Sequence, residues 1–310
     1  MREKPLEIKA FERLLVRMST DHPRYNEFFE RKYRLEAGYS GELDVDRVLH
    51  EIEFSPNSII LKNIRLQVSP HFEFEIDTLI LTTTRLIILE IKKYTGKIYF
   101  DEEVGKTIKV SETGKVDRFD CAVHQLLRAE SALQRWISER NINLPIESII
   151  VMANQRTIIE KWPESVKIKY KKQLPRHISE LPVLAPVLAD DEIKQLAEWI
   201  EESAIQKRYL PACDKYKLPC SDLKWGVLCS NCNGLMNRKR GQKWRCTDCG
   251  KYADNEVRQA LDDWFLLVKP AISNLECRKF LGLKSKFAAS IILRESNLKR
   301  LGNPPKTYYC

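Results

Sequence analysis

The chain has 310 residues, more than one ordinary hydrophobic core spans, so we expect two or three domains. Its apolar fraction of 43% and charged fraction of 31% are typical of globular proteins and argue against fibrous or largely disordered chains. Because it has no long apolar run and its first ten residues are charged, we expect a cytoplasmic protein without membrane spans. The net charge of +9 favours a polyanionic partner, although many soluble proteins are mildly basic without binding one.

The N-terminal part of the chain is predicted to be helical. Apolar residues have helical spacing from Phe11 to Phe54, interrupted at residues 37–41, where two glycines and a serine predict a turn. Glu42 is therefore expected to open a second helix.

The next segment is predicted to form a sheet. Apolar, β-branched runs indicate four consecutive strands, at residues 58–68, 72–82, 85–91 and 97–100. A helix at 121–140 and a buried strand at 147–153 follow. A sheet followed by a helix and a returning strand indicates an α/β layer.

The middle of the chain contains the expected domain boundary. Residues 166–170 are strand-like, and residues 190–209 are expected to form an amphipathic helix that closes the first domain. We place the boundary near Leu210 and Pro211, because cysteine density rises after them. Another helical stretch is expected to begin at Asn255.

Three charged residues interrupt the apolar strands: Asp77 in one strand, and Glu90 and Lys92 in the next. Side chains two positions apart share a face of a strand, and a hairpin partner can bring Asp77 beside them. Carboxylate oxygens suit a hard divalent cation such as Mg²⁺, and a lysine can orient or deprotonate water or stabilise charge on a phosphate. The alternative is a charged pair on the solvent face of an edge strand. The apolar neighbours favour a buried site instead.

Four segments carry a resemblance to a known family: "AGYSGELDVDRVL", "FEIDTLIL", "LEIKKYTG" and "HQLLRAESAL". In order and spacing, residues 33–154 resemble the nuclease-related domain NERD, a branch of the PD-(D/E)xK restriction-endonuclease-like superfamily. The resemblance implies a nuclease that hydrolyses DNA phosphodiester bonds with Mg²⁺ or Mn²⁺. In such a site Asp77 and Glu90 are metal ligands and Lys92 is the catalytic lysine.

The resemblance also assigns residues on two helices. Glu42 matches the helix-borne acid of the family, and Gln125 and Arg128 match its Q-x-x-R helix, which faces the active site or the scissile phosphate. The chain departs from the family at Cys121 and Ala122, where an Asn-Pro pair is usual, and at Lys93, where asparagine is usual. The neighbouring His124 is expected to be structural.

Four cysteines occur as two C-x2-C pairs, Cys229 with Cys232 and Cys246 with Cys249. This spacing lets two turns supply four thiolates to structural Zn²⁺, whose binding folds a ribbon too small to bury a core. Cys213 and Cys220 do not have this spacing and are expected to be free or core thiols. The residues between the pairs predict either a nucleic-acid surface with one aromatic ring or a solvated charged hairpin: Arg238, Lys239, Arg240, Lys243, Trp244 and Arg245.

The C-terminal segment has helix-turn-helix features. Ser273 can cap a helix to Leu281, Gly282 can make the turn, and Ser285 can cap a helix to Glu295. Two strands around a turn at 302–305 then resemble a wing. In a winged helix, basic residues would contact DNA phosphates: Lys284, Lys286, Arg294, Lys299, Arg300 and Lys306. The alternative is a small helical cap with solvated lysines.

Together these observations predict an α/β fold with a restriction-endonuclease-like core, a central mixed sheet flanked by helices. The expected domains are a nuclease-like domain at 1–210 with its core at 33–154, a zinc ribbon at 211–254, and a winged-helix-like DNA-binding domain at 255–310. The favoured function is a DNA nuclease acting in DNA processing or in defence against foreign DNA. The alternatives are a non-catalytic DNA-binding or scaffold protein and a nuclease that acts on RNA.

Overall fold

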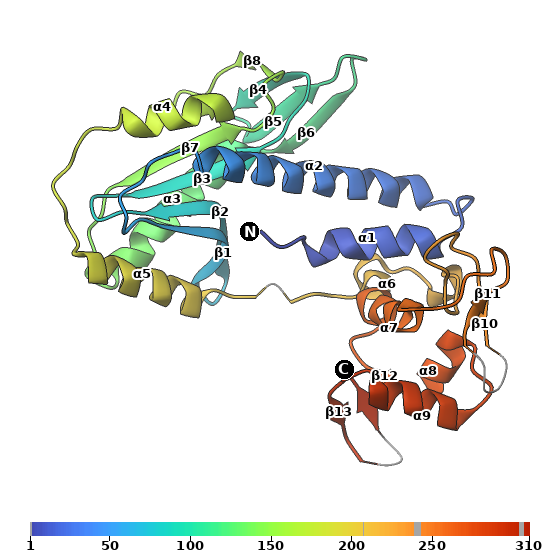
Figure 1. The fold of residues 1–310 in the computed structure, drawn as a ribbon. Helices are drawn as coiled ribbons and strands as arrows, with labels where there is room; N and C mark the ends of the chain where they lie inside the picture. The colour runs from blue at the N-terminus through green and yellow to red at the C-terminus, as the bar shows by residue number, and fades with distance from the viewer. Residues whose placement is uncertain (1, 207, 239–242, 304–306) are drawn as a thin grey trace. The chain divides into compact units, whose positions relative to one another are not determined.

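The computed structural model describes residues 2–206, 208–238, 243–303 and 307–310 (Figure 1). These residues form two compact units. The first unit contains Arg2 and residues 37–206, and the second contains residues 3–36 and the described part of 208–310. Residues 3–36, expected in a domain at 1–210, thus pack with the C-terminal third of the chain.

A five-stranded mixed sheet forms the centre of the first unit, in the order β1-β2-β3-β7-β9. β1, β2 and β3 pair antiparallel, whereas β3, β7 and β9 pair parallel. Helix α3 lies in the chain between the parallel neighbours β3 and β7, as the predicted helix and returning strand require. The bounds are β1 Ile59–Ser69, β2 Phe72–Leu81, β3 Leu86–Lys92, α3 Ala122–Ser138, β7 Ile146–Met152 and β9 Lys167–Tyr170.

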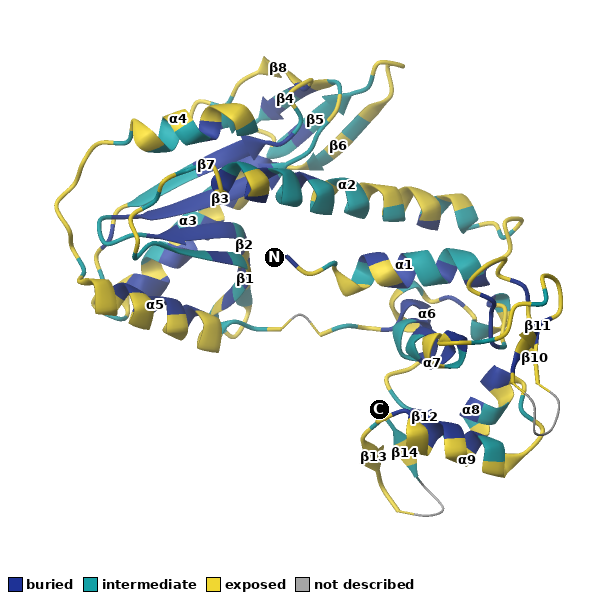
Figure 2. Cartoon of the chain, in the orientation of Figure 1, coloured by how far each residue is buried: buried dark blue, intermediate teal, exposed yellow. Residues whose placement is uncertain are grey.

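Helices cover both faces of this sheet. Alternate strand residues such as Leu79 and Ile88 pack with α3 and with α5 (Asp190–Ser203). The residues between them, such as Ile80 and Leu89, pack with α2 (Tyr25–Leu49) and α4 (Leu174–Ser179). Figure 2 shows the buried strands and the exposed outer sides of the helices. The predicted mixed sheet flanked by helices is therefore confirmed.

A second sheet lies in the same unit, in the order β6-β5-β4-β8. The strand expected at 97–100 belongs to this sheet and not to the central one. Only β4 was predicted, because the other strands are short and mostly polar. Their bounds are β4 Lys97–Asp101, β5 Lys106–Val110, β6 Val116–Asp120 and β8 Ile158–Lys161; a short 3-10 helix, η1, spans Lys171–Gln173.

Two expected helix limits are wrong. The turn predicted at 37–41 is absent, because α2 continues through these residues, and the division between the units falls within it. A β-carbon at Gly41 would lie 2.9 Å from the Lys93 side chain, so this glycine permits close packing and does not mark a turn. The helix expected at 190–209 ends at Ser203, and Ala204 after it is extended.

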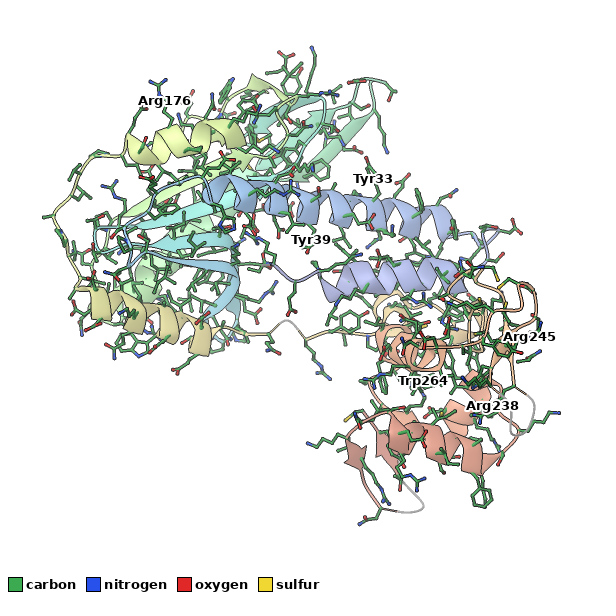
Figure 3. The ribbon with its side chains drawn as sticks, viewed as in Figure 1. Tyr33, Tyr39, Arg176, Arg238, Arg245 and Trp264 are labelled. Carbon is green, nitrogen blue, oxygen red and sulfur yellow. The ribbon has the colours of Figure 1, made fainter. Side chains whose placement is uncertain are left out.

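The second unit packs its helices around one hydrophobic cluster. Phe11 of α1 (Leu6–Arg17) shares this cluster with Trp264 of α7 (Glu256–Leu267), which Figure 3 labels, and with Phe280 of α8 (Asn274–Leu281). Beneath it, the buried carboxylate of Asp263 pairs with Arg17 at 2.7 Å and with Arg13 at 2.6 Å. These contacts explain why residues 3–36 belong to this unit.

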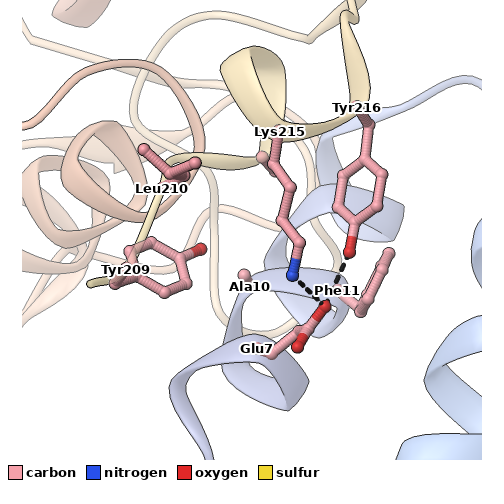
Figure 4. Close-up of a pocket in the computed structure, with 8 residues that line it drawn as sticks. Glu7, Ala10, Phe11, Tyr209, Leu210, Lys215 and Tyr216 are labelled. Atoms are coloured by element: carbon pink, nitrogen blue, oxygen red, sulfur yellow. Dashed lines mark hydrogen bonds and ion pairs between the residues drawn. The ribbon is translucent and has the colours of Figure 1, made fainter. Parts of the chain in front are cut away.

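Smaller elements complete the second unit. Lys215 and Tyr216 donate hydrogen bonds to Glu7 at 2.6 and 2.7 Å and border a pocket of about 10 Å³, enough for one water molecule (Figure 4). The remaining bounds are α6 Ala212–Tyr216, η2 Cys220–Asp222, β10 Met236–Asn237, β11 Arg245–Cys246, β12 Ile272–Ser273, α9 Lys286–Glu295, β13 Arg300–Leu301 and β14 Tyr308–Tyr309.

Candidate active site

Asp77, Glu90 and Lys92 lie on the face of the central sheet that α3 covers. The antiparallel register pairs Thr78 of β2 with Leu89 of β3, which brings Asp77 level with Glu90 one residue further on. Glu90 and Lys92 are two residues apart and therefore share a face. The backbone N–H of Ile91 donates to Asp77 Oδ2 at 2.7 Å, which fixes the carboxylate against β3. The hairpin expected from the sequence thus brings these three residues together.

Gln125 on α3 joins this group. Lys92 Nζ lies 2.6 Å from Glu90 Oε1 and donates a hydrogen bond to Gln125 Oε1 at 3.0 Å. These residues line a pocket of about 410 Å³ together with Asp77 and Arg128, which we call the acid pocket. Glu90 is only 8% exposed and lies on a central strand. An exposed charged pair on an edge strand, the alternative interpretation, is therefore wrong.

The acid pocket holds more negative charge than its surroundings neutralise. Burial and the neighbouring Glu90 raise the pKa of Asp77 to about 7. Burial opposes the charged form of Lys92, but Glu90 and the other acidic groups outweigh it and raise the pKa of Lys92 above its ordinary value. Lys92 is therefore an ammonium group at neutral pH. A buried carboxyl with a raised pKa beside a second carboxylate is typical of sites that gain stability from a divalent cation.

Glu42 lies near this group but is held by another residue. Its carboxylate accepts a hydrogen bond from the guanidinium of Arg2 at 3.1 Å. Burial and the nearby Asp77 raise the pKa of Glu42 to about 7. Glu42 is not among the residues that line the acid pocket. It therefore acts on the site electrostatically, from the adjacent helix α2.

Arg2 is the neighbour of the site that sequence reasoning missed. Its side chain is fully buried and also bonds to Asp46 on α2, Asn63 on β1 and Thr78 on β2. It thus joins α2 to the strand that carries Asp77. An isolated arginine at position 2 has no spacing relation to the motifs, so only the packing identifies it.

The residues that depart from the family pattern have structural partners. Lys93 Nζ donates to Ser40 at 2.8 Å and pairs with Asp44 at 3.2 Å, both on α2, so it points away from the acid pocket. The backbone N–H of Ala122 donates to Thr107 at 3.1 Å and fixes the start of α3, beside the buried Cys121. His124 is exposed on α3.

Four cysteines of the second unit gather as the spacing predicts. The sulfur atoms of Cys229, Cys232, Cys246 and Cys249 all lie within 4.8 Å of one another and are close enough to bind one metal ion. β10 and β11 form the hairpin that carries Cys246. Four thiols at C-x2-C spacing are the ligand set of a structural zinc site.

The basic residues around this cluster are only partly as expected. Lys243 is exposed, as are Arg238 and Arg245, which Figure 3 labels. Trp244 is 7% exposed and packs in the hydrophobic cluster, so the expectation of a surface ring at this position is wrong. The exposed ring is Tyr252, with the Arg245 guanidinium 5.7 Å from its centroid. Lys239 and Arg240 lie outside the described residues.

The C-terminal helices begin where the sequence predicts. The Ser273 hydroxyl accepts from the backbone N–H of Glu276 and starts α8, and Ser285 starts α9 in the same way. Gly282 ends α8 with a φ of 69°. β12, β14 and β13 form a three-stranded sheet in that order. Lys306 lies outside the described residues, and the other five expected phosphate contacts are all exposed: Lys284, Lys286, Arg294, Lys299 and Arg300.

A mixed sheet flanked by helices, with two acids and a lysine gathered on one face, is the arrangement of a nuclease-like fold. Residues 37–153 match the family model of NERD, the nuclease-related domain. The chain therefore contains a nuclease-related domain, and the predicted resemblance is confirmed. No curated protein and no solved structure matches the chain. In the part of the chain that the structure describes, every helix is too short or too polar to cross a membrane.

Proposed function

We propose that the chain is a metal-dependent nuclease that hydrolyses phosphodiester bonds of DNA in the acid pocket. The supporting observation is the convergence of Asp77, Glu90 and Lys92 in one pocket, with Lys92 Nζ 2.6 Å from Glu90. Burying two carboxylates is costly without a cation to neutralise them. The charge of this site therefore favours a bound divalent ion.

The carboxylates of Asp77 and Glu90 would hold Mg²⁺ or Mn²⁺. Such an ion supplies a polarised water and neutralises charge on the reacting phosphate. Carboxylate oxygens at a central sheet are hard ligands, which fits these ions better than zinc or copper. Asp77 is already oriented by the N–H of Ile91, so little reorganisation is needed for it to serve as a ligand.

Lys92 acts on the substrate directly, and Gln125 positions it. Because the pKa of Lys92 is raised, its ammonium group donates hydrogen bonds to the phosphate and stabilises the charge that develops there. Gln125 holds Lys92 in position from α3 through the 3.0 Å hydrogen bond. Arg128, one helical turn further along α3, is available for a neighbouring phosphate oxygen.

Incubation of the full chain with labelled DNA and Mg²⁺ tests this proposal. We expect wild-type protein to cleave and Asp77→Ala to lose at least about a hundredfold in rate, since a metal ligand is removed. Asp191→Ala removes the same side chain from an exposed position on α5 and is expected to keep full activity. Equal rates for wild type and Asp77→Ala, or no cleavage above background, would leave the non-catalytic scaffold as the remaining hypothesis. An RNA strand of the same sequence decides between DNA and RNA.

We further propose that the second unit holds duplex DNA through a winged helix and a zinc-stabilised ribbon. The element order α7-β12-α8-α9-β13-β14, with β14 between β12 and β13, supports the winged helix. Exposed Lys284, Lys299 and Arg300 supply charge for phosphates. Lys299→Glu and Arg300→Glu together should weaken duplex binding and lower its salt dependence. Unchanged binding would exclude this surface. A role in DNA processing or in defence against foreign DNA is compatible with both activities.

A further inference from the structure

A second hollow adjoins the acid pocket along α3. It has a volume of about 510 Å³ and shares two lining residues, Phe72 and Arg128, with the acid pocket, so the two hollows are neighbours. Its floor is apolar, with Val68 and Phe72 from the β1–β2 hairpin facing Leu127 and Ala132 of α3. We call this hollow the α3 groove. An extended ligand that reaches the acid pocket can continue into it.

The rim of the α3 groove carries basic side chains. His124, Arg128 and Arg135 follow one another on the exposed side of α3 at intervals of four and seven residues, which places them in one stripe along the helix. The Arg128 guanidinium lies 5.3 Å from the centroid of the Phe72 ring. Because Arg135 pairs with Glu139 at 3.0 Å, Arg128 is the arginine that offers positive charge for a phosphate, beside an aromatic ring and an apolar floor.

Two further carboxylates line the acid pocket. They belong to Glu73 and Glu75, and both pair with Arg65, so this cation is already engaged. Carboxylates repel the phosphates of an approaching strand. A strand with one phosphate in the acid pocket is therefore directed along α3 and away from the β1–β2 hairpin residues Glu73 and Glu75.

We propose that the α3 groove binds an unstacked nucleotide of DNA next to the scissile phosphate, and that the strand cleaved there is consequently unpaired. This inference rests on the proposed nuclease function. Intact duplex keeps its bases stacked inside and presents phosphates and groove edges to a protein surface. An apolar hollow with an aromatic ring beside the reacting phosphate suits a base that has left the stack.

Two substitutions in the groove test the proposal. Phe72→Leu keeps an apolar side chain but removes the ring, and Ser131→Glu places a negative charge in the groove at an exposed position. Ser138→Glu is the matched control, because it makes the same change at an exposed position of α3 outside the groove. Each full-length variant is given the same labelled strand, alone or in a blunt duplex, with Mg²⁺. The measured quantity is the ratio of kcat/KM for the single strand to that for the duplex.

Wild type and Ser138→Glu should both prefer the single strand. Phe72→Leu and Ser131→Glu should lower the ratio by about 5- to 100-fold, the effect of losing one base-stacking contact. A wild-type preference for duplex, or a ratio that the groove variants leave unchanged while cleavage persists, would overturn this inference alone. Absence of cleavage of both substrates by wild type would instead remove the nuclease function on which it rests.

Discussion

Replacing Asp77 by asparagine should stabilise the protein in the absence of divalent metal. Asparagine keeps an oxygen that can accept the hydrogen bond from the backbone N–H of Ile91, which Asp77 Oδ2 accepts at 2.7 Å. It removes one of the buried charges. The unfolded carboxyl has a pKa near 3.9, and in the folded chain burial and Glu90 raise the pKa of Asp77 to about 7. The ionised form therefore suits the folded state less well than the unfolded state.

The difference between the folded and unfolded pKa of Asp77 sets the sign of the stability change and the pH range in which it occurs. A carboxyl with a raised folded pKa costs nothing below its unfolded pKa, and its cost grows as the pH rises until the folded pKa is passed. A difference of about three pKa units corresponds to about 4 kcal/mol above pH 7. Because Glu90 and Glu42 share the electrostatic environment, we expect asparagine to recover about half, or about 2 kcal/mol. For a unit of this size that is a rise in Tm of about 4–8 °C.

Thermal unfolding at pH 5.5 and pH 8 measures the effect. The buffer should lack Mg²⁺ but contain no chelator, so that a zinc site is not stripped. The advantage of Asp77→Asn over wild type should be larger at pH 8 than at pH 5.5, and Asp191→Asn should show none, because that residue is exposed. Added Mg²⁺ should raise the Tm of wild type more than that of Asp77→Asn. A less stable Asp77→Asn protein, or an advantage independent of pH, would refute the argument.

Three further outcomes are expected. Arg2→Ala should lower the free energy of unfolding by about 3–5 kcal/mol, because Glu42 and Asp46 lose a buried partner. Urea unfolding measures this change. As a control, Arg47→Ala at an exposed helix position should change the free energy of unfolding by less than about 1 kcal/mol. Cys249→Ser should reduce zinc bound per chain in metal analysis, whereas Cys310→Ser should not; equal zinc contents would argue against the four-cysteine site. Asp263→Ala should destabilise the chain by about 3–5 kcal/mol, since two buried or half-buried arginines lose their counter-ion. An unfolding curve like that of wild type would show that this ion pair contributes little.

The central sheet and the acid pocket were largely predictable because their signals are local. Strands apolar on both faces must be buried, and a two-residue period places Glu90 and Lys92 on one side without any structure. The two C-x2-C pairs and the serine caps of α8 and α9 are equally local patterns. Each depends on residues within a few positions of one another.

The rest depends on contacts between distant parts of the chain. Gly41 resembles a turn former in the sequence, and only the approach of Lys93 explains it as a helix residue. Trp244 looked like a stacking ring because its neighbours are basic, but the hydrophobic cluster of the second unit buries it. Arg2 reaches the site from a position that no motif marks. Such errors arise where packing overrides local composition.

The division of residues between the units has a consequence for synthesis of the chain. Helix α1 is translated well before α7, at residues 256–267, which packs on its apolar side. Part of the apolar surface around Phe11 and Leu14 therefore stays exposed until α7 has been translated. The apolar side of newly made α1 is thus a surface to which chaperones would bind. A polypeptide that ended at residue 210 would lack α7, and the apolar side of α1 would stay exposed.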